Sequence, residues 1–150
     1  MNKKLIIGEI VGVALLLSLA FVFPSRPNAD PIASAKQLLL SHGIEVPPYT
    51  IELTDQRPKT ATSDVAMWVY MDTQVIWVLT TTPIWSGAKA GDAGDIMILA
   101  AMLVHEGVHA GGDSDEAHAY DAEIEALDRM GADQSLIDGV QRAKEEALTR

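Results

Sequence analysis

A long apolar run stands at the start of this chain of 150 residues, before any alternating or helical pattern begins. It extends from Leu5 to Phe23 and is broken only by Glu9. A run of this length is just enough to cross a bilayer as a helix. We therefore expect residues 1–23 to form an N-terminal transmembrane helix or signal segment, and residues 24–30 to form a linker.

Two lysines precede the apolar run, which favours a cytoplasmic N-terminus with the rest of the chain on the extracytoplasmic side. The run is longer than the apolar region of a usual cleaved signal peptide, and no convincing small-residue cleavage site follows it directly. We therefore expect a single-pass membrane protein. Cleavage of the segment would give a secreted protein instead.

Shorter patterns follow the linker. The pair Asp30-Pro31 is typical of a helix start, and we expect that helix to end at Gly43. Residues 49–54 alternate between polar and apolar side chains, which predicts a strand. Residues 65–71 and 74–80 are rich in β-branched and aromatic side chains and lie close together, which predicts a hairpin.

The second half of the chain has helical patterns. Residues 96–104 are apolar on every side, which predicts a central, buried helix that ends at the glycines 111–112. Residues 83–94, with four residues that are glycine or proline, predict a loop before it. Two more helices are expected, over residues 114–130 and from residue 133 to the C-terminus.

This order of elements predicts an α+β domain over residues 31–150. We expect a small antiparallel sheet of about three strands packed on the central helix, with flanking helices. The chain has no cysteine, which excludes disulfides and thiolate zinc sites. Its net charge is −10 and no basic stripe follows the apolar run, so nucleic acid is not an expected partner.

The sequence His105-Glu106-Gly107-Val108-His109 stands inside the apolar helix. Because residues four apart share a helix face, His105 and His109 can present two ring nitrogens to one metal ion. Glu106 lies beside that pair, where a carboxylate can hold a metal-bound water. Burying such groups without partners costs several kcal/mol, and a bound cation would remove most of that cost. The pattern therefore predicts a metal site.

The third ligand can be sought in the residues that follow. Asp115 completes His-x-x-Gly-x-x-Asp with His109, and His118 has a good ligand side chain. Helical phase places His118 on the solvent side of its helix but turns Glu116 and Glu123 inward, with Glu123 further from the histidines. Phase therefore favours Glu116, while Asp115, His118 and Glu123 stay open as alternatives.

Residues 101–110 and the run Glu-Ala-His-Ala-Tyr-Asp-Ala-Glu at 116–123 resemble a small gluzincin, a member of the zincin metallopeptidases. In that group the third zinc ligand is a Glu that opens a following helix. The resemblance covers about residues 65–130. It implies a minimal zincin-like domain in which the hairpin lies beside the active-site helix.

The resemblance also implies a ligand set and a reaction. His105, His109 and Glu116 would bind Zn2+, and Glu106 would be the catalytic base that activates a zinc-bound water. The reaction implied is hydrolysis of peptide bonds in a peptide or protein substrate. The alternative is a membrane-tethered, metal-stabilised binding domain without turnover, but a structural metal site would not need Glu106.

Two residues come into question as partners of the metal-bound histidines. A zinc-bound His usually donates its second N–H to a carboxylate or a carbonyl. Asp113 and Asp121 are close enough in sequence to accept it, although both are expected at the surface. Tyr120 is expected in the core.

Overall fold

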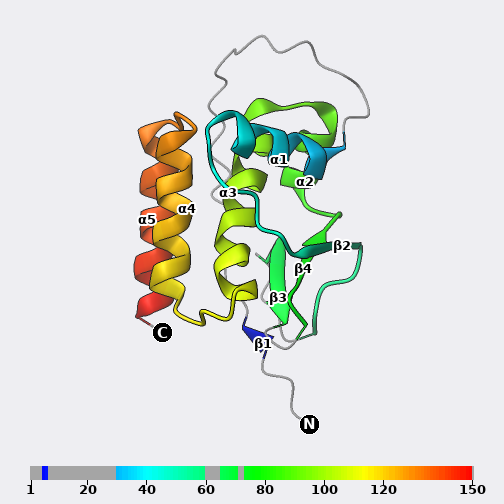
Figure 1. Cartoon of the computed structure of the whole chain (residues 1–150), viewed down its shortest axis with the longest axis vertical. Helices are drawn as coiled ribbons and strands as arrows, with labels where there is room; N and C mark the ends of the chain where they lie inside the picture. The colour runs from blue at the N-terminus through cyan, green and yellow to red at the C-terminus, as the bar shows by residue number, and fades with distance from the viewer. Residues whose placement is uncertain (1–4, 7–29, 60–64, 71–72, 150) are drawn as a thin grey trace.

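The computed structural model describes part of the chain, which Figure 1 draws in colour: residues 5–6, 30–59, 65–70 and 73–149. Of the predicted membrane segment, only Leu5 and Ile6 are described, and they form the short strand β1 (Leu5–Ile6). Apart from this pair and Asp30, the transmembrane helix predicted over residues 1–23 and the linker at 24–30 lie outside the described residues. Both stay predictions.

Five helices lie in the described part of the chain: α1 (Pro31–Ser41), α2 (Pro83–Ala90), α3 (Ala93–Ala110), α4 (Glu116–Arg129) and α5 (Gln134–Leu148). Helix α3 is central and packs against α1, α2, α4 and the strands β3 and β4, whereas α5 packs on α4 (Figure 1). The α+β class and the central helix are therefore confirmed.

Helix α3 is also the one described helix that is long and apolar enough to span a membrane. Half of that span is buried inside the protein, which is what the core helix of a folded domain shows. Its Asp92 side chain accepts a hydrogen bond from the Asp95 N–H and caps the first turn. The burial of α3 is thus explained by packing within the domain.

The sheet is mixed, which corrects the prediction of an antiparallel one. Its described strands lie in the order β1-β3-β4-β2, with β2 at Thr50–Thr54, β3 at Met67–Tyr70 and β4 at Val75–Leu79. Strand β3 runs antiparallel to both β1 and β4, as a hairpin requires, but β2 runs parallel to β4. The alternating pattern has the same period in both kinds of pairing, so it could not reveal this direction.

The predicted loop over residues 83–94 is wrong, because most of it forms α2. Thr82 caps that helix by accepting a hydrogen bond from the Trp85 N–H at 3.1 Å. Pro83 occupies the first turn, where its missing N–H has no effect on the helix. Gly91 ends α2 with a left-handed φ of 87°. Pro83 and Gly91 therefore bound a helix instead of breaking one.

The connection from α1 to β2, residues 42–49, packs closely against α3. A Cβ atom at Gly107 would lie 2.6 Å from Cγ of Pro47, and one at Gly111 would lie 3.0 Å from the Tyr49 hydroxyl. Only glycine allows so close an approach at residue 107. The connection therefore packs directly on the half of α3 that carries the two histidines.

Candidate metal centre

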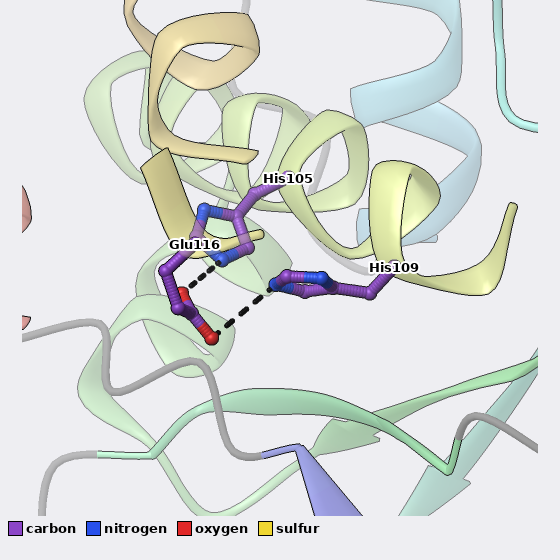
Figure 2. Close-up of side chains that lie close together, drawn as sticks. All are labelled: His105, His109 and Glu116. Atoms are coloured by element: carbon purple, nitrogen blue, oxygen red, sulfur yellow. Dashed lines mark ion pairs between the residues drawn. The ribbon is translucent and has the colours of Figure 1, made fainter. Parts of the chain in front are cut away.

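Helix α3 presents His105 and His109 on one face, as their spacing predicts (Figure 2). Both side chains have an exposed fraction of 0%. Their ring centroids lie 5.1 Å apart with an edge-to-face angle of 74°. The two imidazoles are therefore held close together in the interior, one helical turn apart.

Glu116 opens α4 and points back at the histidines (Figure 2). The residue before it, Asp115, caps α4 by accepting a hydrogen bond from the Ala117 N–H at 2.8 Å. Oε2 of Glu116 lies 3.5 Å from Nε2 of His105, and Oε1 lies 3.4 Å from Nε2 of His109. The short turn between α3 and α4 therefore brings three potential ligands together.

The geometry of this group fits a metal ion. Its ligand atoms all lie within 4.8 Å of one another. In a tetrahedral zinc site with usual bond lengths, neighbouring ligand atoms lie about 3.4 Å apart, which matches the two N···O separations. Neither Nε2 atom makes a hydrogen bond to Glu116, and Oε2 of Glu116 is likewise buried without a hydrogen-bond partner. A cation would satisfy all three atoms.

The outer nitrogens of both histidines have partners. Nδ1 of His105 lies 3.0 Å from Oε2 of Glu123, and Nδ1 of His109 lies 2.8 Å from the Asp113 main-chain carbonyl oxygen. A carbonyl only accepts, so Nδ1 of His109 donates, and the neutral ring keeps its lone pair on Nε2. These contacts leave both Nε2 atoms on the side of Glu116, as metal ligation requires.

Glu123, an alternative ligand by its sequence, lies in the structure behind His105, on the side of the ring away from Glu116. Its side chain is 2% exposed. Its inward helical phase was the signal that could have identified it. Asp121, considered for that role, instead pairs with Lys144 at the surface.

The other two ligand candidates lie outside the group. His118 is exposed, and its Nδ1 lies 2.9 Å from a carboxylate oxygen of Asp113. Asp115 uses a side-chain oxygen to cap α4. Among the described residues, the three-ligand group therefore contains Glu116, and the part that each member plays in binding stays a prediction.

Glu106, which follows His105, also has buried oxygen atoms without a hydrogen-bond partner. Its side chain has an exposed fraction of 0%, and neither carboxylate oxygen has a hydrogen-bond partner. Burial raises the pKa of Glu106 to about 7, outweighing the opposite effect of the nearby charges on His105 and His109. The carboxyl group can therefore hold a proton at neutral pH or release it.

The carboxylates around the two histidines stabilise positive charge among these side chains. Burial is the largest influence on the His105 pKa and lowers it, but contacts with Glu116 and Glu123 outweigh burial and raise that pKa to about 10. Burial acts upward on the pKa of Glu116, while the two histidines lower it to about 2. The group thus keeps Glu116 ionised and favours a cation between these side chains.

Tyr120 completes the packing around His105. The two rings meet edge to face with centroids 4.7 Å apart, and the tyrosine is fully buried, as expected for a core residue. Burial and the neighbouring Glu123 and Glu116 charges raise the pKa of its hydroxyl group, so it stays protonated.

Comparisons of the chain with protein-family models, with curated proteins and with solved structures give no match. The functional reading therefore rests on the chemistry of these side chains. The described residues contain a buried His-His-Glu group that could hold a metal ion, with an unpartnered carboxyl group close by.

Proposed function

We propose that this chain is a zinc-dependent peptidase in which His105, His109 and Glu116 hold the metal and Glu106 is the catalytic base. The observation that carries the proposal is the fully buried, unpartnered Glu106 carboxyl group beside a three-ligand set. A purely structural metal site gives no reason for that carboxyl group to be there.

The number of ligands supports catalysis over a structural role. Structural zinc sites have four protein ligands, whereas catalytic sites have three and keep a position open. Within the described residues, the group offers three. A bound zinc ion would supply Lewis-acid chemistry, polarising a carbonyl group and lowering the pKa of a water molecule to about 7.

Glu106 would carry out the proton transfers of the reaction. Glu106, whose pKa is about 7, can accept a proton from water at a carboxylate oxygen and return it to the leaving amine of a cleaved peptide bond. Glu123 and the Asp113 carbonyl hold the two imidazole rings in orientation. Burial excludes bulk water, which strengthens each of these electrostatic contacts.

The substrate and the location belong to the same proposal. Zinc-dependent hydrolysis by such a site suits a peptide or protein substrate. The apolar run at residues 5–23, preceded by lysines, supports a domain tethered to a membrane on the extracytoplasmic side. The second candidate function, a tethered metal-stabilised binding domain without turnover, is favoured by the same ligands but leaves Glu106 without a role.

Two measurements on the full chain test the proposal. Elemental analysis should find about one zinc per chain in wild type and in His118→Ala, and none in His105→Ala or Glu116→Ala. Glu106→Gln should keep the metal and abolish hydrolysis of an unstructured protein such as casein. A folded wild type that binds no metal would overturn the proposal. Metal binding with hydrolysis that survives Glu106→Gln would remove Glu106 from its role.

A further inference from the structure

One residue in the turn between α3 and α4 contacts both helices that carry the candidate ligands. The main-chain carbonyl of Asp113 accepts a hydrogen bond from Nδ1 of His109 at 2.8 Å. Its main-chain N–H donates to the carbonyl oxygen of Val108 at 3.3 Å. Both contacts attach Asp113 to the last turn of α3. Because the His109 ring is oriented by this carbonyl, the ring depends on where the turn places Asp113.

The side chain of Asp113 reaches the start of α4. Its Oδ1 accepts a hydrogen bond from the Asp115 N–H at 2.9 Å, and its Oδ2 lies 2.9 Å from Nδ1 of His118 in the first turn of α4. Glu116 directly follows Asp115 and is the first residue of α4. A change in the conformation of this turn would therefore move Glu116 as well as His109.

A second exposed aspartate provides a contrast. Asp121 lies on α4, is 63% exposed and pairs with Lys144 of α5. Asp113 is 44% exposed, yet its two main-chain polar groups and both carboxylate oxygens have partners in the two ligand-bearing helices and the turn between them. An exposed ion pair contributes little by its charge. The contacts of Asp113 therefore matter for the geometry of the turn.

We propose that Asp113 is a positioning residue of the metal centre. Its side chain holds the turn in the conformation in which its own carbonyl meets His109 and Glu116 faces the two histidines (Figure 2). The inference rests on the proposed function and deepens it, because it names the residue that joins the ligands of α3 to the ligand of α4. It concerns metal binding and does not itself require hydrolysis.

Zinc affinity of the full chain, measured by competition with a chromogenic chelator, tests the inference. Asp113→Ala keeps the main-chain carbonyl and removes only the side-chain contacts, and it should weaken zinc binding by about 10- to 100-fold. Asp113→Asn removes the charge but keeps an acceptor for the Asp115 N–H, so its affinity should stay within about threefold of wild type. The matched control Asp121→Ala should bind zinc as wild type does.

Cobalt(II) in place of zinc separates positioning from a contribution to stability alone. The visible absorption of cobalt(II) depends on the geometry of its ligands. At saturating cobalt, Asp113→Ala should shift and weaken the absorption bands, whereas Asp113→Asn and Asp121→Ala should give the wild-type spectrum. A spectrum of Asp113→Ala identical to that of wild type, with only a lower unfolding temperature, would overturn the inference. So would a loss of zinc affinity in Asp113→Asn as large as that in Asp113→Ala, because the effect would then come from charge.

His118→Ala provides a second variant if Asp113→Ala fails to fold. It removes the Oδ2 contact of Asp113 from an exposed position and leaves the contact with Asp115 in place. It should still bind about one zinc per chain, with an affinity lowered by about threefold, because a single exposed contact contributes little. A zinc affinity equal to that of wild type would then contradict the inference.

The outcomes separate this inference from the proposed function. Weaker zinc binding and a changed cobalt spectrum in Asp113→Ala, both restored in Asp113→Asn, would support the inference even if wild type did not hydrolyse casein, a result that would sink the peptidase alone. Equal zinc affinity in wild type and Asp113→Ala, with hydrolysis that is lost in Glu106→Gln, would overturn the inference and leave the peptidase standing. A folded wild type that binds no metal would overturn both.

Discussion

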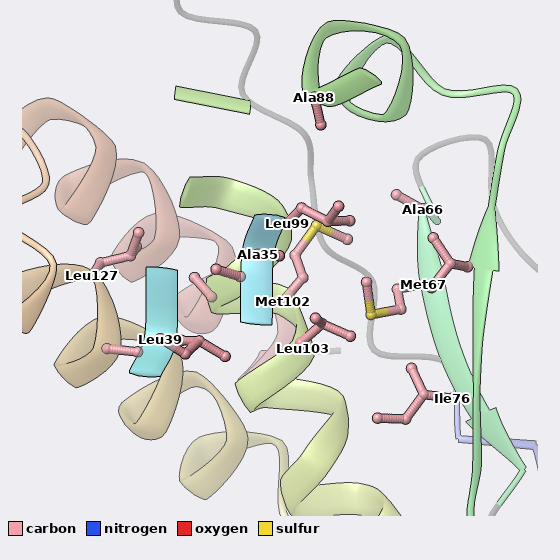
Figure 3. Close-up of a cluster of buried hydrophobic side chains, with 14 of the residues drawn as sticks. Ala35, Leu39, Ala66, Met67, Ile76, Ala88, Leu99, Met102, Leu103 and Leu127 are labelled. Carbon is pink, nitrogen blue, oxygen red and sulfur yellow. The ribbon is translucent and has the colours of Figure 1, made fainter. Parts of the chain in front are cut away.

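The buried part of α3 has an apolar half, residues 99–103, and a polar half that contains His105, Glu106 and His109. These residues are equally buried but have opposite chemistry. Residues 99–103 are all apolar and at most 2% exposed, and Figure 3 shows Leu99, Met102 and Leu103 lying among apolar side chains of α1 and the sheet. One turn further on, His105, Glu106 and His109 are just as deeply buried.

This difference is informative because burial acts oppositely on the two halves. Removing apolar side chains from water stabilises the fold by about 1.5–3 kcal/mol for each large residue. Burying imidazole and carboxyl groups opposes folding unless they are paired. In the first half burial needs no further explanation, whereas in the second it leaves unpaired polar atoms that a cation could satisfy.

The largest expected effect is in the apolar half. Leu103→Ala should lower the free energy of unfolding by about 4 kcal/mol, since Leu103 is 1% exposed and its removal leaves a cavity. Urea unfolding with and without zinc measures it. The loss should be the same in both conditions; a loss confined to one of them would mean that the two halves are not independent.

The second prediction concerns Glu106 and pH. The pKa of Glu106 is about 7 in the folded protein and 4.5 in an ordinary setting. As pH rises from 4.5 towards 7, the unfolded chain therefore loses this proton while the folded protein keeps it, and the free energy of unfolding falls. From about pH 4.5 to 6.5 the metal-free protein should lose about 2–3 kcal/mol through this group.

Glu106→Gln should flatten that slope, because the amide does not titrate. Urea unfolding in the presence of a chelator, repeated across this pH range, measures the slope for both proteins. Above pH 6.5 the raised pKa of His105, about 10, adds a separate loss of stability in both proteins. If the unfolding free energy of both proteins had the same slope against pH below about pH 6.5, Glu106 would be ionised in the folded protein and the prediction would be wrong.

A third prediction concerns Glu123, whose carboxylate contacts Nδ1 of His105. Glu123→Gln should weaken zinc binding by roughly 10- to 100-fold, because it replaces the carboxylate that orients His105. The exposed Glu125 on the same helix provides the matched control, and Glu125→Gln should leave zinc affinity unchanged. Competition with a chromogenic chelator gives both constants. Equal affinities in the two variants would make Glu123 a core residue without influence on the metal.

The smallest expected effect compares the N-cap residues of α4 and α5. Asp115→Ala should cost about 1 kcal/mol of stability, because Asp115 caps α4 and so holds Glu116 in place. Asp133 stands at the same position before α5 but makes no side-chain cap hydrogen bond, so Asp133→Ala should cost less. Thermal unfolding of the two variants compares them. A larger effect at Asp133 would contradict this account of the α4 start.

Local signals in the chain were sufficient for the described helices other than α2 and for the histidine pair. The spacing of His105 and His109 determines that they share a face wherever the helix lies, and the inward phase of Glu116 follows from the apolar stripe of α4. The resemblance to gluzincins used only such short-range information.

Tertiary structure decided what depends on residues far apart in the chain. The parallel pairing of β2 with β4, the contact of Glu123 with His105 and the position of β1 beside β3 each join residues whose local patterns are silent about their partner. Sequence by itself determined which side chains face inward, because that follows from the period of each element. Which inward side chains meet one another depends on how the elements pack, and packing is a property of the whole fold.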